Sequence, residues 1–417
     1  MIRILLKNGN LVDPLQNKIL KKDILIEDGN VSKIASSIRL GRKCPEHNCQ
    51  VIDCQGLLIV PGLIDMHVHF RTPGQEHKET LATGSMAALA GGFTTVLAMA
   101  NTVPVPDDPN KLFNLLIRNE NEGLVRILQA SPLTKGLQGK ESIIIMPRGN
   151  KIGVPAASDD GRAPQDPKIL MSAMRSCKEW GLPILLHCED YRFPPNDKWS
   201  EILYISLVLK LAQEQDASIH IQHVSCQESV KLIKRAKVLG VKVTCETAPH
   251  YMALTQKDFK RIGADAMMNP PLRGEADRQA IIQGLFDATI DVIATDHAPH
   301  TDEEKEGHHP PFGIIGLETA VPVVLSVLKR HLSLPEIFAK MTINPARILR
   351  LKQKGLIRKG WPADITIIDL KKRKVLEAQD LKSKSHNSPW LGKRLQTWPV
   401  MTIRNGKILM KDGKITI

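Results

Sequence analysis

Aromatic side chains are scarce in this chain, at only 4% of its 417 residues. The net charge of +13 has the sign that nucleic-acid-binding proteins carry. Those proteins, however, also stack bases on aromatic side chains or contain a recognisable binding module. The chain has neither, so we expect no nucleic-acid partner. A solvated basic surface, which can also steer anionic substrates, explains the excess charge better.

Long apolar runs are also missing. None reaches the roughly 18 residues that mark a membrane-spanning helix, so we expect no membrane partner. The first ten residues, MIRILLKNGN, have a short apolar core. They lack the longer hydrophobic region and the small-residue cleavage site of a signal peptide. We therefore predict a first strand there and a cytoplasmic protein.

The cysteines show no disulfide framework, because the seven are odd in number and scattered. Three of them, Cys44, Cys49 and Cys54, lie close to His47. Their spacing matches no common structural zinc motif, so we expect no metal there.

The pattern of apolar stretches and turn signals divides the chain into three ranges. Residues 1–57 contain short apolar stretches separated by Asn8-Gly9 and Asp28-Gly29, which are strong hairpin signals. Residues 356–417 show the same pattern of short apolar stretches, with a further pair at Asn405-Gly406. Neither end is large enough to hold a good core alone. We predict that the two ends together form one small composite β-sandwich domain.

Residues 58–355 differ, because apolar strands alternate there with amphipathic helical stretches. Such alternation predicts an α/β fold of parallel βα units, and the length suits a (β/α)8 barrel. A doubly wound sheet is the alternative, but no glycine-rich phosphate loop follows a first strand. The predicted strands after the first are 94–99, 125–129, 143–146, 183–187, 218–223, 242–246 and 291–295, and the predicted helices include 167–180, 200–215 and 227–239.

The first barrel strand is predicted within the stretch VPGLIDMHVHFR, from Val60 to Arg71. Side chains at positions i and i+2 of a strand project from the same face. His67 and His69 therefore face the same way and can bind one metal ion through their ring nitrogens. Arg71 continues that parity and could present its planar guanidinium to a carboxylate beside the metal.

Polar residues of the same kind recur at the ends of the other predicted strands. The reactive residues of a (β/α)8 barrel lie at the C-terminal ends of its strands. A single polar residue there is usually a cap, but histidines and aspartates at five strand ends predict a metal site. The residues at these ends are Asn101, Asp160, His187, His223, Asn269, Asp296 and His300.

Strand parity keeps other residues out of this cluster. His220 lies on the face opposite to His223 and is expected to be packed or solvated, and His297 points away from the face of Asp296. Asp159 is expected to cap or hydrogen-bond locally. Surface roles in loops are expected for His250, His308 and His309.

Four histidines and two aspartates suit two adjacent metal ions that share one carboxylate. Such ions lower the pKa of bound water toward 7. A carboxylate at the edge of the site can then carry a proton to a leaving nitrogen. The predicted chemistry is hydrolysis of an amide-like bond, or the reverse reaction.

With these residues assembled, the chain resembles the amidohydrolase superfamily and, within it, the type I dihydroorotases, nearly from end to end. The resemblance implies zinc-dependent, reversible cyclisation of N-carbamoyl-L-aspartate to L-dihydroorotate in the synthesis of the pyrimidine nucleotide UMP. The motifs that carry it are PGLIDMHVHFR at 61–71, NT at 101–102, DDG at 159–161, HCED at 187–190, NPPLR at 269–273, ATDHAPH at 294–300 and PFGIIGLE at 311–318.

The resemblance also implies roles for individual residues. Six residues would hold one or two zinc ions: His67, His69, Asp160, His187, His223 and Asp296. Asp160 would bridge the ions where related enzymes use a carboxylated lysine, and Asp296 would relay a proton to the departing nitrogen. Six residues would bind the substrate: Arg71, Asn101 and His300 at its α-carboxylate, Asn269 at its ring, and the backbone near Phe312 and Gly313 at its pyrimidine edge.

Two alternatives stay open. Hydantoinases, dihydropyrimidinases and allantoinases share the fold but use a lysine at the fourth strand, where this chain has Asp159-Asp160-Gly161. They also have no need of Arg71, Asn101 and His300, which would bind the α-carboxylate of the substrate. The second alternative is a dihydroorotase-like subunit that supports aspartate carbamoyltransferase or is active only with it, because the segments 188–222 and 301–311 are shorter than usual. Scaffolds of this kind typically lose the metal ligands, which this chain keeps. The family also implies a homodimer.

Overall fold

Eight parallel strands form a closed barrel in the computed structural model, which describes residues 3–39, 49–143 and 154–416. Hydrogen bonds join neighbouring strands from β6 through β8 in one sheet and from β9 through β13 in another. Two isolated parallel bridges, Ser131 to Ala157 and Val68 to His297, close the ring. The predicted (β/α)8 barrel is confirmed. Its strands are β6 Leu63–Val68, β7 Phe93–Ala98, β8 Arg126–Gln129, β9 Ala157–Ser158, β10 Ile184–Leu186, β11 Ile219–Ile221, β12 Val243–Thr247 and β13 Val292–Ile293.

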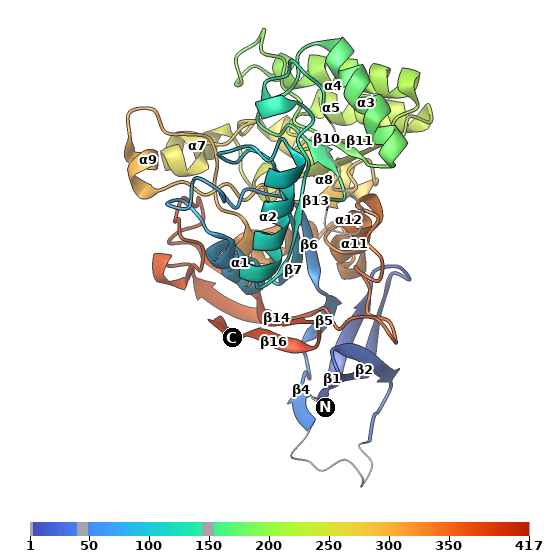
Figure 1. Cartoon of the computed structure of the whole chain (residues 1–417). Helices are drawn as coiled ribbons and strands as arrows, with labels where there is room; N and C mark the ends of the chain where they lie inside the picture. Colours follow the sequence, from blue (N-terminus) through green and yellow to red (C-terminus); the bar gives the residue numbers. More distant parts are fainter. Residues whose placement is uncertain (1–2, 40–48, 144–153, 417) are drawn as a thin grey trace.

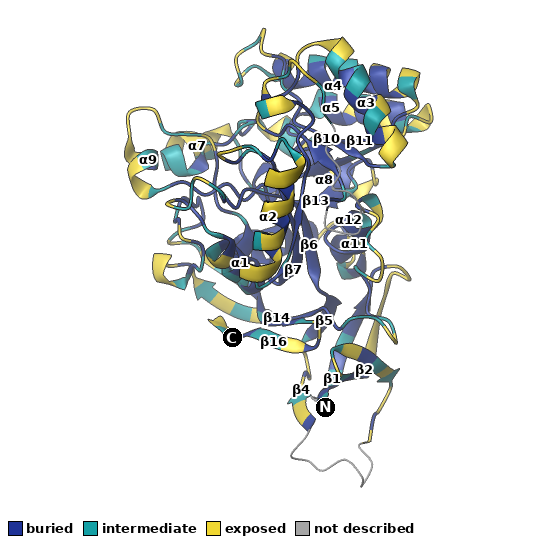
Figure 2. Ribbon diagram, viewed as in Figure 1, coloured by how far each residue is buried: buried dark blue, intermediate teal, exposed yellow. Residues whose placement is uncertain are grey.

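Helices lie between the barrel strands in the chain and cover the outside of the barrel (Figure 1). Their outward faces are exposed, whereas the strands are buried (Figure 2). The three predicted helices are confirmed as α3, α4 and α5. Of these, α3 begins after Asp166, whose carboxylate accepts a hydrogen bond from the N–H of Lys168, and ends at left-handed Gly181. The α-helices are α1 Leu81–Ala90, α2 Pro109–Glu122, α3 Pro167–Trp180, α4 Lys198–Gln215, α5 Gln227–Val238, α6 Pro249–Ala253, α7 Gln256–Ile262, α8 Glu275–Phe286, α9 Asp302–Glu306, α10 Ala320–Leu328, α11 Leu334–Ala339 and α12 Ile343–Ile348.

The fourth barrel strand is not where the sequence pattern predicted it. Of the predicted range 143–146, only Ile143 lies within the described residues, and it is not in a strand. The strand that pairs with β10 at this place in the barrel is β9, which directly precedes Asp159. Because β9 has only two residues, it is too short for hydrophobic periodicity to reveal it.

The two ends of the chain meet in one mixed sheet of nine strands, in which β5 is central. β5 pairs in parallel with β1 and antiparallel with β14, so hydrogen bonds join the strands of both ends into one sheet. Apolar side chains from both ends share a core that includes Ile24, Ile59 and Ile365. In Figure 1, β14 and β16 run across the direction of β1 and β2. The strands are β1 Arg3–Asp13, β2 Lys18–Glu27, β3 Asn30–Ala35, β4 Cys49–Asp53, β5 Leu58–Pro61, β14 Ile365–Val375, β15 Arg394–Arg404, β16 Lys407–Lys411 and β17 Lys414–Ile415.

The composite domain is thus present, although β5 belongs to its sheet and the barrel starts only at β6. The division of the chain at 57 and 355 stays a prediction. Among the described residues, no helix has the length and apolar character needed to cross a bilayer. Cys44 and His47 lie outside the described residues, and the free cysteines that are described are all buried.

The Asn8-Gly9 pair forms a bulge within β1, not the predicted hairpin turn. The pairing register with β2 shifts there, and the N–H of Asn8 donates to Oδ1 of Asp23 at 2.9 Å. A Cβ on Gly9 would lie 2.2 Å from Cδ1 of Ile59, so close packing requires the glycine. The other two pairs, Asp28-Gly29 and Asn405-Gly406, form the predicted turns between β2 and β3 and between β15 and β16.

Candidate metal centre and active site

Three of the predicted ligands converge at the C-terminal end of the barrel. His67 lies on β6, His69 follows that strand, and Asp296 follows β13. Oδ1 of Asp296 lies 3.2 Å from Nε2 of His69 and 3.5 Å from Nε2 of His67. All three residues are buried, and their ligand atoms are close enough together to hold one metal ion.

Asp160 lies between this group and a second pair of histidines. Its Oδ1 is 3.3 Å from Nε2 of His67, 3.6 Å from Nδ1 of His187 and 3.6 Å from Nε2 of His223. Its Oδ2 is 3.3 Å from Nε2 of His69. One carboxylate therefore faces four imidazoles, which is the arrangement expected of a carboxylate that bridges two metal ions.

The internal contacts of this cluster fit a metal better than a hydrogen-bonded network. Oδ1 of Asp160 is buried without a hydrogen-bond partner. Nδ1 of His187 lies only 2.8 Å from Nε2 of His223. A buried acceptor without a donor costs free energy, and a cation among these oxygen and nitrogen atoms would satisfy them together. His67, Asp160 and His223 form a second group that could hold one ion.

The two carboxylates are held in their ionised form, which is the form that binds metal. Burial alone would favour protonation of Asp160. The charge of His67 and the nearby imidazoles of His187 and His223 outweigh it and hold the pKa of Asp160 well below its usual range. The pKa of Asp296 is lowered against its burial in the same way, by the charge of His67 and a hydrogen bond with His69.

Outer partners orient the imidazole rings. Oε1 of Glu246, on β12, lies 2.7 Å from Nδ1 of His67, and its Oε2 lies 3.1 Å from Nε2 of His220. Burial opposes ionisation of this glutamate, but hydrogen bonds with His220 and His67 lower the pKa of Glu246 to about 2. Oδ1 of Asn101 lies 2.9 Å from Nδ1 of His69. Such partners determine which ring nitrogen faces the metal.

The backbone is left-handed at three of the strand ends that form the site. The φ angles are 57° at Arg71, 32° at His223 and 52° at Asp296. Non-glycine residues seldom adopt this conformation, and backbone strain of this kind concentrates at functional sites.

A positively charged group for an anion lies beside the cluster. One terminal guanidinium nitrogen of Arg71 lies 3.1 Å from Nε2 of His300, and Nε of Arg71 donates to the carbonyl of Pro299 at 3.1 Å. Burial and the nearby charges of Arg71 and Lys78 lower the pKa of His300 to about 3, so its imidazole is neutral. The carbonyl of Phe312 lies 2.9 Å from Nε2 of His300.

A cavity of about 360 Å³ contains nearly all of the predicted site. The predicted residues that line it are His69, Arg71, Asn101, Asp160, His187, His223, Asn269, Asp296, His300, Phe312 and Gly313. His67 lies behind them, fully buried. Gly313 has a φ of 135°, and a Cβ there would lie 2.8 Å from the carbonyl oxygen of Ala298 and 3.1 Å from the ring of His300. Only glycine therefore fits at this part of the wall.

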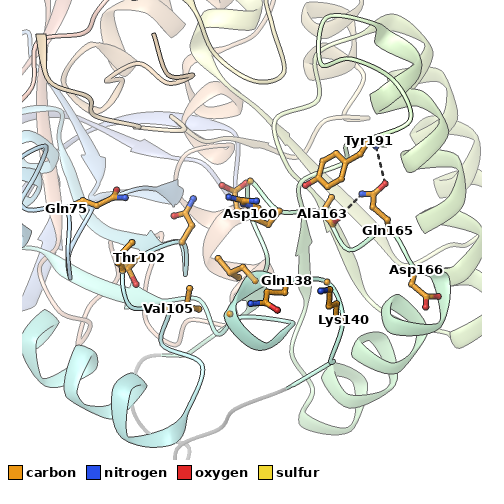
Figure 3. Close-up of a pocket in the computed structure, with 17 residues that line it drawn as sticks. Gln75, Thr102, Val105, Gln138, Lys140, Asp160, Ala163, Gln165, Asp166 and Tyr191 are labelled. Carbon is orange, nitrogen blue, oxygen red and sulfur yellow. Dashed lines mark hydrogen bonds between the residues drawn. The ribbon is translucent and has the colours of Figure 1, made fainter. Parts of the chain in front are cut away.

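A larger cavity of about 880 Å³ shares Asn101, Asp160 and Gly161 with the first. Figure 3 shows Asp160 between Gln75 and Thr102 on one side and Tyr191 on the other. Two exposed basic residues, Lys140 and Arg162, also line this cavity. It provides an approach from solvent to the metal cluster.

Most residues that were kept out of the cluster lie where the sequence predicted. Asp159 accepts backbone N–H groups of Leu133 and Thr134, so its role is local. His220 is packed and His297 is bound to Glu79, away from the site. His308 and His309 are exposed as predicted. The surface prediction for His250 is wrong, because this residue is 2% exposed on α6, with its ring 4.2 Å from that of Tyr251.

Sequence reasoning missed two carboxylates. Glu246 was included in a predicted strand without a role. Oε2 of Glu189 lies 2.9 Å from Nε2 of His187, and its Oε1 accepts a hydrogen bond from Nδ2 of Asn269 at 3.2 Å. The same rule that paired His69 with His67 could have indicated Glu189, because Glu189 lies two positions after His187.

Comparisons with known proteins agree with this geometry. The amidohydrolase family matches residues 58–409. The dihydroorotase of Halalkalibacterium halodurans is 37% identical over 435 residues, which cover 99% of this chain and 100% of the relative. The dihydroorotase of Bacillus cereus strain B4264 is 39% identical over 425 residues, covering 97% of each. The solved structure of an L-hydantoinase from Arthrobacter aurescens matches with a TM-score of 0.88 and 25% identity, covering 100% of this chain and 98% of that one.

The chain belongs to the amidohydrolase family, which comprises metal-dependent hydrolases, and the enzyme acts on cyclic amide bonds. Within that family it groups with the dihydroorotases, because relatives of that name match it over nearly the full length of both chains. The hydantoinases share the fold as a related group.

Proposed function

We propose that this chain catalyses the reversible cyclisation of N-carbamoyl-L-aspartate to L-dihydroorotate in pyrimidine synthesis, through a two-metal site. The observation that carries the proposal is that Arg71 and His300 line the same cavity as Asp160 and Asp296. A guanidinium next to a metal site recognises a carboxylate. Dihydroorotate has a carboxylate on the ring carbon that lies two bonds from the amide carbonyl carbon that is attacked.

The metal would be zinc, which suits histidine and carboxylate ligands. One ion would be held by His67, His69 and Asp296, and a second by His187 and His223, with Asp160 shared between them. When bound, the ions would lower the pKa of water to near neutrality and polarise the carbonyl of the cyclic amide.

Asp296 would move the proton. It borders the cavity and is ionised, so it can accept a proton. In hydrolysis, Asp296 would take the proton of the attacking water and pass it to the ring nitrogen as the carbon–nitrogen bond breaks. In cyclisation the same proton would return from the nitrogen to the water that leaves.

The remaining predicted residues would orient the substrate. Arg71 and the neutral ring of His300 would hold the α-carboxylate together with the side-chain amide of Asn101, whose Oδ1 is already engaged by His69. Asn269 would contact the ring while Glu189 fixes its amide. The N–H of Gly313 donates to the carbonyl of Met267, so we propose that this residue acts by its close approach rather than by a hydrogen bond.

The experiment is metal analysis together with dihydroorotate hydrolysis, on the wild type and on Asp296→Asn. We expect the wild type to contain zinc and turn over dihydroorotate, and Asp296→Asn to keep at least one ion while losing about 10²-fold or more in kcat, as removal of a general acid–base group does. Asp287→Asn, at a surface ion pair with Lys234, serves as a control that keeps both properties.

Other outcomes separate the alternatives. Turnover of dihydrouracil or a hydantoin without turnover of dihydroorotate would assign the chain to the hydantoinase group. A zinc-loaded but inactive protein that becomes active with aspartate carbamoyltransferase would identify that enzyme as its partner. That partnership, the homodimer and the cytoplasmic location remain predictions. A protein that binds no metal would contradict the proposal.

A further inference from the structure

A buried lysine holds one wall of the cavity of about 360 Å³, which is called the substrate cavity below. Lys305, on α9, is only 6% exposed. Its Nζ donates to the carbonyl of Gly313 at 2.8 Å, to that of Pro311 at 2.9 Å and, more weakly, to that of Met267 at 3.4 Å. Pro311 and Gly313 both line the substrate cavity, so the ammonium lies directly behind that wall.

These contacts use the ammonium fully. An ammonium has three N–H donors, and here three carbonyl oxygens accept them. Within the described ranges, no carboxylate oxygen lies within 4.0 Å of this nitrogen to form an ion pair. A buried charge without a counterion costs free energy, so this lysine is better explained by what it holds in place than by overall stability.

The turn that Lys305 holds also contacts the anion-binding group. The carbonyl of Phe312 lies 2.9 Å from Nε2 of His300. The Gly313 carbonyl also accepts a hydrogen bond from Asn387, whose Oδ1 in turn accepts one from the N–H of His300. Displacement of the 311–313 turn would therefore move His300 and with it the proposed carboxylate site.

Helix α9 is itself fixed on its other side. Nζ of Lys78 lies 2.8 Å from Oε1 of Glu304 and 3.4 Å from Nδ1 of His300. Thr301 caps the start of the helix, and its hydroxyl accepts a hydrogen bond from the N–H of Glu304. Lys305 thus projects from an anchored helix, so its ammonium has a defined position relative to the 311–313 turn.

We propose that Lys305 is a positioning residue that fixes the Pro311–Gly313 wall and thereby sets the affinity of the site for its carboxylate-bearing substrate. This inference rests on the proposed function for its substrate but not for its geometry. A positioning role predicts an effect on KM more than on kcat, because Lys305 contacts neither the metal cluster nor the reacting atoms.

The test uses Lys305→Met, which keeps most of the length of the side chain and removes its donors. We expect KM for dihydroorotate to rise about tenfold or more, as loss of hydrogen bonds to a charged group implies. The metal content should stay the same. The change in kcat should be less than about threefold, which is much smaller than the expected change in KM. Lys305→Arg, which keeps the charge and donors, should recover most of the affinity.

Lys340→Met is the matched control. Lys340 is 5% exposed and donates to the carbonyl of Ile290 at 2.8 Å, outside the residues that line the substrate cavity. We expect this variant to lose stability without raising KM. An equal rise of KM in both variants, or an unchanged KM in Lys305→Met, would overturn the proposal.

Two further measurements test the proposal in other ways. Amide hydrogen exchange of residues 312–315 should be at least about tenfold faster in Lys305→Met than in the wild type, because local opening sets the rate of exchange. Faster exchange in a protein whose wild type does not turn over dihydroorotate would contradict the proposed function but support the positioning role. Unchanged exchange would overturn that role.

The second measurement is the pH dependence of KM, which needs only Lys305→Arg and the wild type. Burial lowers the pKa of Lys305 to about 8, against the opposing charges of Asp265, on the 3₁₀ turn Gly263–Ala266, and of Glu304 on its own helix. KM of the wild type should therefore rise above about pH 8, as the ammonium becomes neutral. Lys305→Arg, whose side chain stays charged, should not show this rise, and a rise at the same pH in both would contradict the role.

Discussion

Oε1 of Glu246 lies 2.7 Å from Nδ1 of His67, while Nε2 of the same ring faces Asp160. A carboxylate behind a ligating histidine fixes its tautomer and strengthens it as a ligand. His220 holds the other oxygen of this glutamate. The metal site thus extends one layer deeper into the barrel than its ligands.

Glu246→Gln should weaken metal binding without removing a ligand. We expect the metal dissociation constant to rise about 10- to 100-fold, as loss of such outer partners does. Calorimetric titration of the metal-free protein with zinc measures this change. Glu228→Gln, at a surface ion pair with Lys198, should leave the constant unchanged, and an unchanged constant in Glu246→Gln would show that His67 needs no such support.

Arg71→Lys should damage substrate binding although the charge is conserved. Lysine offers a point charge in place of the planar fork that matches a carboxylate, and Arg71 also donates to Pro299. We expect kcat/KM to fall by about 10- to 100-fold with the metal content retained, since hydrogen bonds to charged groups contribute roughly 1.5–3 kcal/mol. Arg118→Lys, in an exposed pair with Glu122, is the control. Wild-type kinetics in Arg71→Lys would place the carboxylate elsewhere.

Arg162→Ala should slow the capture of the anionic substrate. Arg162 is exposed and lines the larger cavity that leads to Asp160. We expect kcat/KM to fall about two- to fivefold at low salt and the difference to shrink as ionic strength rises, because screening suppresses steering by exposed charges. Lys210→Ala, on the exposed side of α4, should have no effect. A loss that is independent of salt would indicate direct contact with the substrate instead.

Glu318→Gln should stabilise the protein at alkaline pH. Burial raises the pKa of Glu318 from 4.5 to about 7, although its carboxylate accepts the N–H groups of Lys382 and Ser383. The folded state thus binds the proton more tightly than the unfolded chain. Wild-type stability therefore falls as the pH rises from about 4.5 to about 7 and stays lower above that range.

At pH 8 we expect Glu318→Gln to be more stable than the wild type by roughly 1–3 kcal/mol, with the difference lost below about pH 4.5. Urea unfolding at both pH values measures it. Glu336→Gln should behave in the opposite way, because hydrogen bonds from Ser333 lower the pKa of Glu336. A Glu318→Gln variant that is less stable at pH 8 would mean that the charge itself is needed there.

Much of the fold and of the ligand set follows from local rules. Barrel strands and helices differ in hydrophobic period, and the i+2 rule selected His67 with His69. The C-terminal ends of parallel strands meet in one place, so His187, His223 and Asp296 could be assigned to one cluster before any distance was known. The structure brings these residues together with Asp160.

Other parts depend on contacts that the local pattern does not contain. Lys305 lies in the run DEEKE of α9, which is typical of a solvated helix. Its ammonium is buried among the carbonyls of Met267, Pro311 and Gly313, which lie elsewhere in the chain. His250 follows a strand in the sequence as a loop residue would, but α6 packs it inside. The bulge at Asn8-Gly9 is likewise determined by Ile59, which is fifty positions further along the chain.

The central position of β5 has a consequence for how a nascent chain matures. β5 needs β1 on one side and β14 on the other, and β14 begins only at Ile365. β5, which precedes the strand β6 that carries His67, therefore stays half-paired until almost the whole chain has left the ribosome. Pairings between segments this far apart in sequence form slowly, so assembly of the metal centre should be a late event in folding, after the helices of the barrel.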